Sequence, residues 1–238
     1  HLEHRRQRQM CIRDSYGSAY PVGKIGTLDA PPMFLAAMRV LCVFLFFLPF
    51  FQFKLPPSRL FLPLLGFSLS MGVCTYAFMY YALSFTSLVA PIVIGAQLAI
   101  PFGLILSLIF LNEKVSFFKW ILILTSFIGI VVIAYDPAFI DERIALIFCI
   151  LMAFFYASAN MMARYLNEID TSALNGWCNF FAFFPLLIGS IFLDGNTLSI
   201  ITELNLSTIL VILHASLIVS VIGHAGMFYL YRFYPVNM

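Results

Sequence analysis

The chain has 238 residues, of which 62% are hydrophobic, 17% aromatic and only 10% charged, and its mean hydropathy is +0.98. Soluble domains are about 45–50% apolar and about 25% charged. So few charges cannot cover the surface of a soluble core, which excludes a soluble enzyme, a disordered tail and a nucleic-acid-binding protein. The composition therefore predicts an integral membrane protein. The five cysteines have no metal-ligand spacing, and we expect neither a metal site nor a cofactor.

Residues 1–15 differ in composition from the rest of the chain. The stretch HLEHRRQRQMCIRDS contains four of the thirteen Lys and Arg residues, and an apolar sequence begins abruptly at Tyr16. We predict that residues 1–15 are a non-native artefact, and a basic arm beside the membrane is the competing interpretation. Without this stretch the basic and acidic residues balance, so the net charge of +2 disappears.

Long apolar segments dominate the remaining sequence. A membrane-spanning helix needs about 20 apolar residues. Seven segments qualify, namely 33–51, 60–83, 88–111, 119–135, 143–163, 172–193 and 209–231. Residues 16–26 resemble the second half of a further span, and the chain stops just after a span, so we expect a fragment at both ends. The fold class is thus predicted to be an all-α membrane protein, a polytopic helical bundle.

Local signals mark several ends of these helices. Pro31-Pro32 is expected to open the first helix, and Pro56-Pro57 precedes the second. Asn112 is expected to end a helix in the left-handed conformation, and Ser116 to cap the helix that follows.

Basic residues in the short loops predict the orientation. Cytoplasmic loops of membrane proteins carry an excess of Lys and Arg. One set of alternate connections contains Lys54, Arg59, Lys114, Lys119, Arg164 and Arg232, whereas the other contains Lys24 and Arg143. We therefore place the first set in the cytoplasm.

Two blocks of sequence recur along the chain. Tyr16, Ser18 and Ala19 recur 140 residues later, and a second block recurs at an offset of 148. In the second block Ser68, Leu69, Ala77, Met79, Tyr81 and Phe85 match Ser216, Leu217, Ala225, Met227, Tyr229 and Phe233. Five spans separate the copies, and because five is odd the second copy must enter the membrane the other way round. This predicts two inverted five-helix repeats, over residues 16–135 and 143–238.

Three stretches resemble EamA-type members of the drug/metabolite transporter superfamily. They are YGSAYPVGKIGTLDAPPMFLAAMR, APIVIGAQLAIPFGLILSLIFLNEKVSFFKWILILTSFIGIVVIAYDP and SVIGHAGMFYLYRFYPVN. The resemblance is closest to the O-acetylserine/cysteine exporter branch. It implies ten spans, so the first span would be partial and the last two of the second repeat missing. It also implies export of amino acids or their derivatives.

The predicted spans contain no Asp or Glu, since Glu113 and Glu142 lie at their edges. This excludes the mechanism of small multidrug exporters, which rely on a membrane-buried glutamate. Arg39 is the single basic residue well inside a span, too few for a doubly charged anion. We expect a neutral polar pocket for a small zwitterionic or uncharged solute.

The clearest local signal is Gln97 with Pro101. Proline has no N–H, so we expect the carbonyl of Gln97 to lose its helical partner near the middle of the membrane. Either this carbonyl binds the solute, or the proline produces a simple kink in which a neighbouring helix supplies the hydrogen-bond partner of the carbonyl.

Further candidate substrate-binding residues are spaced four apart and so share a helix face. They are Tyr76 and Tyr80, Tyr156 and Asn160, and Ser216, Ser220 and His224. The competing interpretation is that these hydroxyls bond the neighbouring backbone or belong to the interfacial belt. Arg39 would either tether helices or steer a substrate carboxylate. His224, equivalent to Tyr76 by the offset of 148, would bond a neighbouring carbonyl or carry a proton.

We therefore expect a secondary transporter of the bacterial inner membrane, with the lipid bilayer and a small-molecule solute as partners. A proton is the candidate coupling ion and a homodimer the candidate assembly. The alternatives are a transporter of another solute, such as a drug or nucleobase, and a membrane-embedded enzyme. Short loops and the lack of carboxylates disfavour the enzyme.

Overall fold

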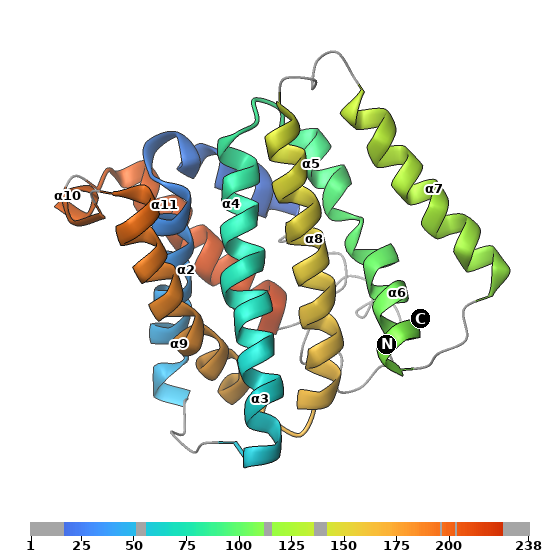
Figure 1. The fold of residues 1–238 in the computed structure, drawn as a ribbon. Coiled ribbons are helices and arrows are strands. Elements are labelled where there is room, and N and C mark those ends of the chain that lie inside the picture. Colours follow the sequence, from blue (N-terminus) through green and yellow to red (C-terminus); the bar gives the residue numbers. More distant parts are fainter. Residues whose placement is uncertain are drawn as a thin grey trace, which may run out of the picture.

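The computed structural model describes residues 17–50, 56–111, 116–135, 142–195, 197–202 and 204–225. Every regular element in these ranges is a helix, which confirms the predicted polytopic all-α fold class (Figure 1). The expected helix end at Asn112 and the segments 1–15 and 226–238 lie outside the described residues.

The first half of the chain forms the predicted helices with small changes at their ends. A helix covers residues 17–29, so the partial first span continues three residues further than predicted. The elements that follow are α2 (Pro32–Phe47), η1 (Leu48–Phe50), α3 (Ser58–Phe67), η2 (Ser68–Thr75), α4 (Tyr76–Ser84), α5 (Val89–Ala96), α6 (Ala99–Leu111) and α7 (Phe117–Ala134). The elements α3, η2 and α4 form one continuous helix over Ser58–Ser84, with the π-helical η2 at its centre.

The second half is built in the same way. It contains α8 (Arg143–Ala163), η4 (Arg164–Leu166), α9 (Thr171–Gly189), η5 (Ser190–Asp194), α10 (Thr197–Thr202), α11 (Leu206–Leu213) and η6 (His214–Ala225). By length and composition, five helices of the described chain can cross a membrane, and α2 and α7 are shorter apolar helices.

Capping signals in the sequence correspond to the observed helix starts. Helix α2 begins at Pro32 with Pro31 as its N-cap, and the hydroxyl of Ser116 accepts a hydrogen bond from the N–H of Lys119 at 3.5 Å. Proline cannot cap α2 with its side chain. Asp194, 160 residues away, supplies that function, since its Oδ2 accepts from the N–H of Phe34 at 2.9 Å.

The helices pack against one another in one bundle. Helix α2 lies along α9, and α8 packs against α4 and α6 (Figure 1). At the crossing of η2 and α9, a Cβ built on Gly72 would lie 2.4 Å from the Cβ of Ala182. Only glycine permits this approach, which sets the position of η2 against α9.

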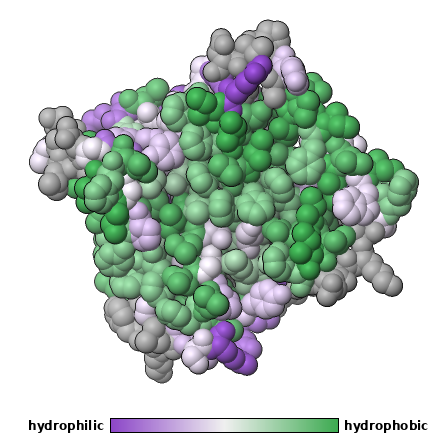
Figure 2. Space-filling model, viewed as in Figure 1, coloured by the Kyte–Doolittle hydropathy of each residue, from purple (hydrophilic) through white to green (hydrophobic). Residues whose placement is uncertain are grey.

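Large apolar side chains also cover much of the outside of this bundle. Phe117 and Phe192 are each about four-fifths exposed. The exposure of many such large apolar side chains to water would be unfavourable. Figure 2 shows hydrophobic residues across the middle of the molecule and hydrophilic ones gathered towards its upper and lower ends. This distribution is that of a protein surrounded by lipid.

Candidate functional site

The helix that contains Gln97 and Pro101 is interrupted, as the proline predicts. Gln97 and Leu98 form a turn between α5 and α6, and their N–H groups donate to the carbonyls of Ile94 and Gly95, each at 3.0 Å. These bonds join residues three apart, so the chain tightens one turn before the proline. The break thus lies at mid-span, between the two halves of Val89–Phe110.

The prediction that the carbonyl of Gln97 has no helical hydrogen-bond partner is wrong. The N–H of Ile100 donates to it at 3.0 Å. The prediction assumed that the helix continues up to the proline, where residue 101 would be the donor. Because the backbone turns earlier, residue 100 takes that place. The polar group that Gln97 presents to the interior is therefore its side-chain amide.

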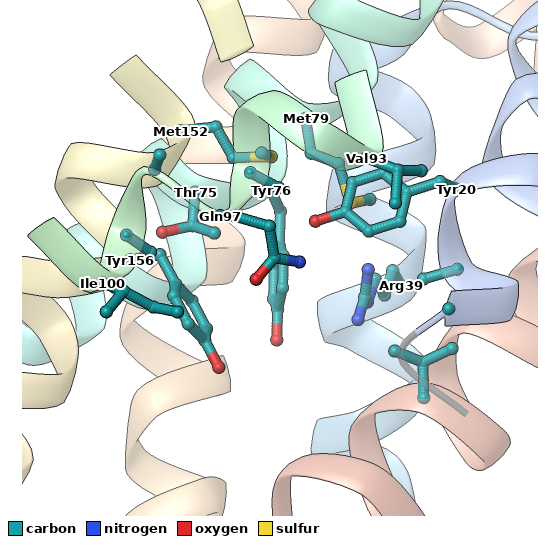
Figure 3. A pocket seen from close by; sticks show the side chains of 16 residues that line it. Tyr20, Arg39, Thr75, Tyr76, Met79, Val93, Gln97, Ile100, Met152 and Tyr156 are labelled. Atoms are coloured by element: carbon teal, nitrogen blue, oxygen red, sulfur yellow. The ribbon is translucent and has the colours of Figure 1, made fainter. Parts of the chain in front are cut away.

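A pocket of about 610 Å³ lies beside this break. Its lining comes from the helix 17–29, α2, the η2–α4 junction, α5, α6, α8 and η6. The polar side chains in the lining are Tyr20, Arg39, Thr75, Tyr76, Gln97 and Tyr156 (Figure 3). Among the described residues, no acidic side chain lines it. A cavity of this size with few convergent polar groups is typical of small-molecule sites.

The structure brings four of the predicted site residues together in this lining. Arg39, Tyr76 and Tyr156 come from three different helices and Gln97 from the turn between α5 and α6, and all four line the same space (Figure 3). Helix α8 supplies Tyr156, whose ring lies on the far side of Tyr76 from Arg39 in this view.

The other predicted residues do not line the pocket. Tyr80 and Ser220 are buried behind it, in contact with Arg39. Pro101 lies in the first turn of α6, and Asn160 lies one turn beyond Tyr156 on α8. The backbone of His224 belongs to η6, but its side chain lies outside the described residues.

Sequence reasoning missed Tyr20 and Thr75. A tyrosine in a predicted partial span is typical of an interfacial belt, yet Tyr20 lines the pocket. The repeat offset of 140 relates Tyr20 to Asn160, which was chosen as a site residue, so the repeat could have identified it. Thr75 carries no such signal, because it faces the pocket only at the end of the π-helical η2.

Arg39 is the charged centre of the lining. Only 1% of the residue is exposed, and its Nε donates to the hydroxyl of Ser220 at 3.0 Å. Its guanidinium carbon lies 4.0 Å from the centre of the Tyr76 ring, which is a cation–π contact. Ser216 also donates to the main-chain carbonyl of Arg39 at 3.3 Å. Arg39 therefore joins α2 to η6, as the tethering interpretation expects.

Polar contacts join helices at the end that the loop charges assign to the outside. Lys24 donates to the carbonyl of Leu83 at 3.0 Å, and Glu142 accepts from the N–H of Ser87 at 2.7 Å and from the hydroxyl of Thr86 at 2.5 Å. Partial burial raises the pKa of Glu142, but the hydrogen bonds from Ser87 and Thr86 outweigh it, so its pKa lies below the ordinary value. With the Asp194 cap, these contacts join three pairs of segments at one end of the bundle: the helix 17–29 with α4, the turn after α4 with the start of α8, and α2 with η5.

Comparison with known proteins agrees with this architecture. The sequence model of the EamA-like transporter family matches residues 15–135, half of the chain, and the search of curated proteins gave no match. Among the described residues, no group of three or more His, Cys, Asp or Glu side chains could hold a metal ion. The chain therefore belongs to the EamA-like transporter family and is a multi-pass membrane transporter of small solutes.

Proposed function

We propose that the protein exports amino acids or their derivatives across the bacterial inner membrane, by alternating access around the pocket of about 610 Å³. The observation that carries this proposal is a polar pocket beside a mid-span helix break, with one cation and no acidic side chain in its described lining. Secondary transporters bind solutes near the bilayer midplane at such breaks. The volume suits an amino acid.

The position of the π-helical segments supports two inverted repeats. Adding the offset of 148 to η2 (Ser68–Thr75) gives residues 216–223, which lie inside the π-helical η6. Within each segment, the equivalent serine bonds the carbonyl four residues before it: Ser68 to Leu64 at 2.8 Å and Ser216 to Ile212 at 2.6 Å. Segments of this kind are rare and occur at functional sites. Two at equivalent positions favour duplication, and the family match ends at residue 135, where the first repeat is expected to end.

The contacts at the two ends of the bundle support alternating access. Lys24, Glu142 and Asp194 each join separate helices at the proposed outer end, whereas an exposed ion pair of Arg59 with Glu168 lies at the other. We interpret this arrangement as the state closed to the outside. Release of the solute outward would require these outer contacts to break.

The proposed solute class follows from the resemblance to the O-acetylserine/cysteine exporter branch. A zwitterionic amino-acid derivative suits a pocket that contains a guanidinium, an amide and three tyrosine hydroxyls, since the latter groups donate and accept. A proton remains the proposed coupling ion, with His224 as its proposed carrier, and a homodimer the proposed assembly.

Counterflow of radiolabelled amino acids in proteoliposomes containing the full-length protein tests the proposal. Gln97→Leu removes the amide from the pocket, and we expect uptake to fall about tenfold or more. Pro101→Ala restores an N–H that favours a continuous helix, so we expect lower transport with unchanged or improved stability.

Ser126→Ala is the matched control, because Ser126 is exposed on α7 and bonds only its own helix, at the carbonyl of Leu122. Its uptake should equal that of the wild type. Full activity of both pocket variants would contradict a solute site beside the break. Absence of counterflow for every amino acid and derivative would contradict the proposed solute class.

A further inference from the structure

Arg39 brings a positive charge into the pocket that no acidic side chain of the described lining balances. It is the one cationic side chain among the described lining residues, and 1% of it is exposed. A guanidinium remains charged at every physiological pH. Burying it far from water is unfavourable unless a negative charge or several hydrogen bonds replace its hydration.

The described residues provide hydrogen-bond partners for only part of this guanidinium. Nε donates to Ser220, the ring of Tyr76 covers one side at 4.0 Å, and the buried hydroxyl of Tyr80 also contacts Arg39. Nη1 is fully buried and has no hydrogen-bond partner among the described residues. Every partner named so far is neutral, so the charge itself is not balanced within the described pocket.

The geometry around Arg39 identifies the missing partner. In Figure 3 the guanidinium of Arg39, the amide of Gln97 and the hydroxyl of Tyr20 point into one space. We propose that Arg39 binds the carboxylate of the transported solute, with the unpartnered Nη1 as one donor. This inference rests on the proposed function and deepens it by naming the group that the solute must carry.

Charge and shape favour a carboxylate over other anions. A guanidinium presents parallel N–H donors that match the two oxygens of a carboxylate, whereas chloride offers a single spherical acceptor. A phosphate carries up to two negative charges, and one arginine would leave the second unbalanced in a pocket without another described cation. One carboxylate pairs with one guanidinium, and the side-chain carbonyl of Gln97 and the tyrosine hydroxyls remain as neutral acceptors for the ammonium of an amino acid.

Chemical modification of arginine tests the inference without relying on transport. Phenylglyoxal reacts with guanidinium groups, and peptide mass spectrometry measures the extent at each arginine of the full-length protein. We expect Arg39 to react, and each amino acid or O-acetyl-L-serine that binds to slow this reaction about tenfold. The corresponding amides and methyl esters, chloride and inorganic phosphate should leave the rate unchanged.

Arg59 is the internal control, because its side chain is 69% exposed and should react equally under all conditions. Three outcomes would overturn the inference: an Arg39 that never reacts, protection by no carboxylate, or equal protection by an acid and its amide. Protection by chloride or phosphate as strong as that by the acids would overturn it as well.

Variants of Arg39 provide a second measurement. In thermal unfolding of the protein in nanodiscs, acids should raise the Tm of the wild type more than their amides do. Arg39→Gln should lower the preference for acid over amide by about tenfold or more, because a charged hydrogen bond is lost. Arg39→Lys keeps the charge but lacks the parallel N–H donors of a guanidinium, so it should retain part of the preference for acids.

If Arg39→Gln does not fold, Arg39→Lys and the modification rates still decide the question. A preference for acids that is unchanged in the variants would contradict the carboxylate site. Counterflow of amides as fast as that of acids would also contradict it while leaving the proposed transport intact. Conversely, protection of Arg39 by acids in a protein that shows no counterflow would contradict the proposed function alone.

Discussion

Gly72 lies where η2 crosses α9, so Gly72→Ala should destabilise the bundle. The added Cβ would lie 2.4 Å from the Cβ of Ala182, whereas carbon atoms in contact lie about 3.5–4.0 Å apart. No rotamer can move either Cβ, so the helices must separate by about 1 Å, and overpacking of this kind costs about 1–3 kcal/mol. Alanine in a helix gains about 1 kcal/mol over glycine. Because neither Cβ can move away, we expect the overpacking cost to lie in the upper part of this range, at about 2–3 kcal/mol, and the net loss to be about 1–2 kcal/mol.

The assay is reversible unfolding of the purified protein in detergent micelles. Gly103→Ala is the matched control, because a Cβ there meets no atom within 4 Å and should stabilise by up to about 1 kcal/mol. Ala182→Gly in the Gly72→Ala background removes the second Cβ, so the double variant should recover most of the loss. The packing argument fails if Gly72→Ala is as stable as the wild type, or if Ala182→Gly gives no rescue.

Two polar contacts at the proposed outer end give further predictions. Asp194→Ala removes the cap of α2 and should cost about 1 kcal/mol in thermal unfolding, whereas Asp194→Asn keeps an acceptor and should cost less; equal losses would argue against capping. The pKa of Glu142 lies below its ordinary value when folded, so the carboxylate stabilises above the unfolded pKa and this contribution disappears as the pH falls through the folded pKa. Glu142→Gln should therefore be less stable than the wild type at neutral pH and equally stable in acid, and a difference in stability that persists in acid would contradict the assignment.

The helices could be predicted from sequence because their signals are local. The length of the apolar segments predicted the position of every described span, and Pro31-Pro32 and Ser116 marked two helix starts. These signals depend on the backbone of one segment and on lipid as solvent, neither of which requires knowledge of the neighbouring helices.

The site was predicted only in part, because its remaining features depend on contacts between helices. No local signal predicts the π-helical η2, which turns Thr75 into the pocket and packs through Gly72 on α9. Arg39 illustrates the same limit. Its position within the predicted span is close enough to the end for the side chain to reach the membrane interface. In the structure, however, a hydrogen bond to Ser220, 181 residues away, holds it inside the bundle.

The charge of the pocket links its structure to the energetics of transport. With Arg39 and no acidic side chain in the described lining, the guanidinium of the empty site has no carboxylate to pair with, and the carboxylate of a bound solute supplies one. Closing the bundle around the guanidinium–carboxylate pair should therefore cost less electrostatic energy than closing it around the guanidinium alone. A carrier of this kind should return more slowly when empty than when loaded, so exchange of solutes should exceed net efflux in proteoliposomes. Net efflux as fast as exchange would mean that another group balances Arg39 in the empty state.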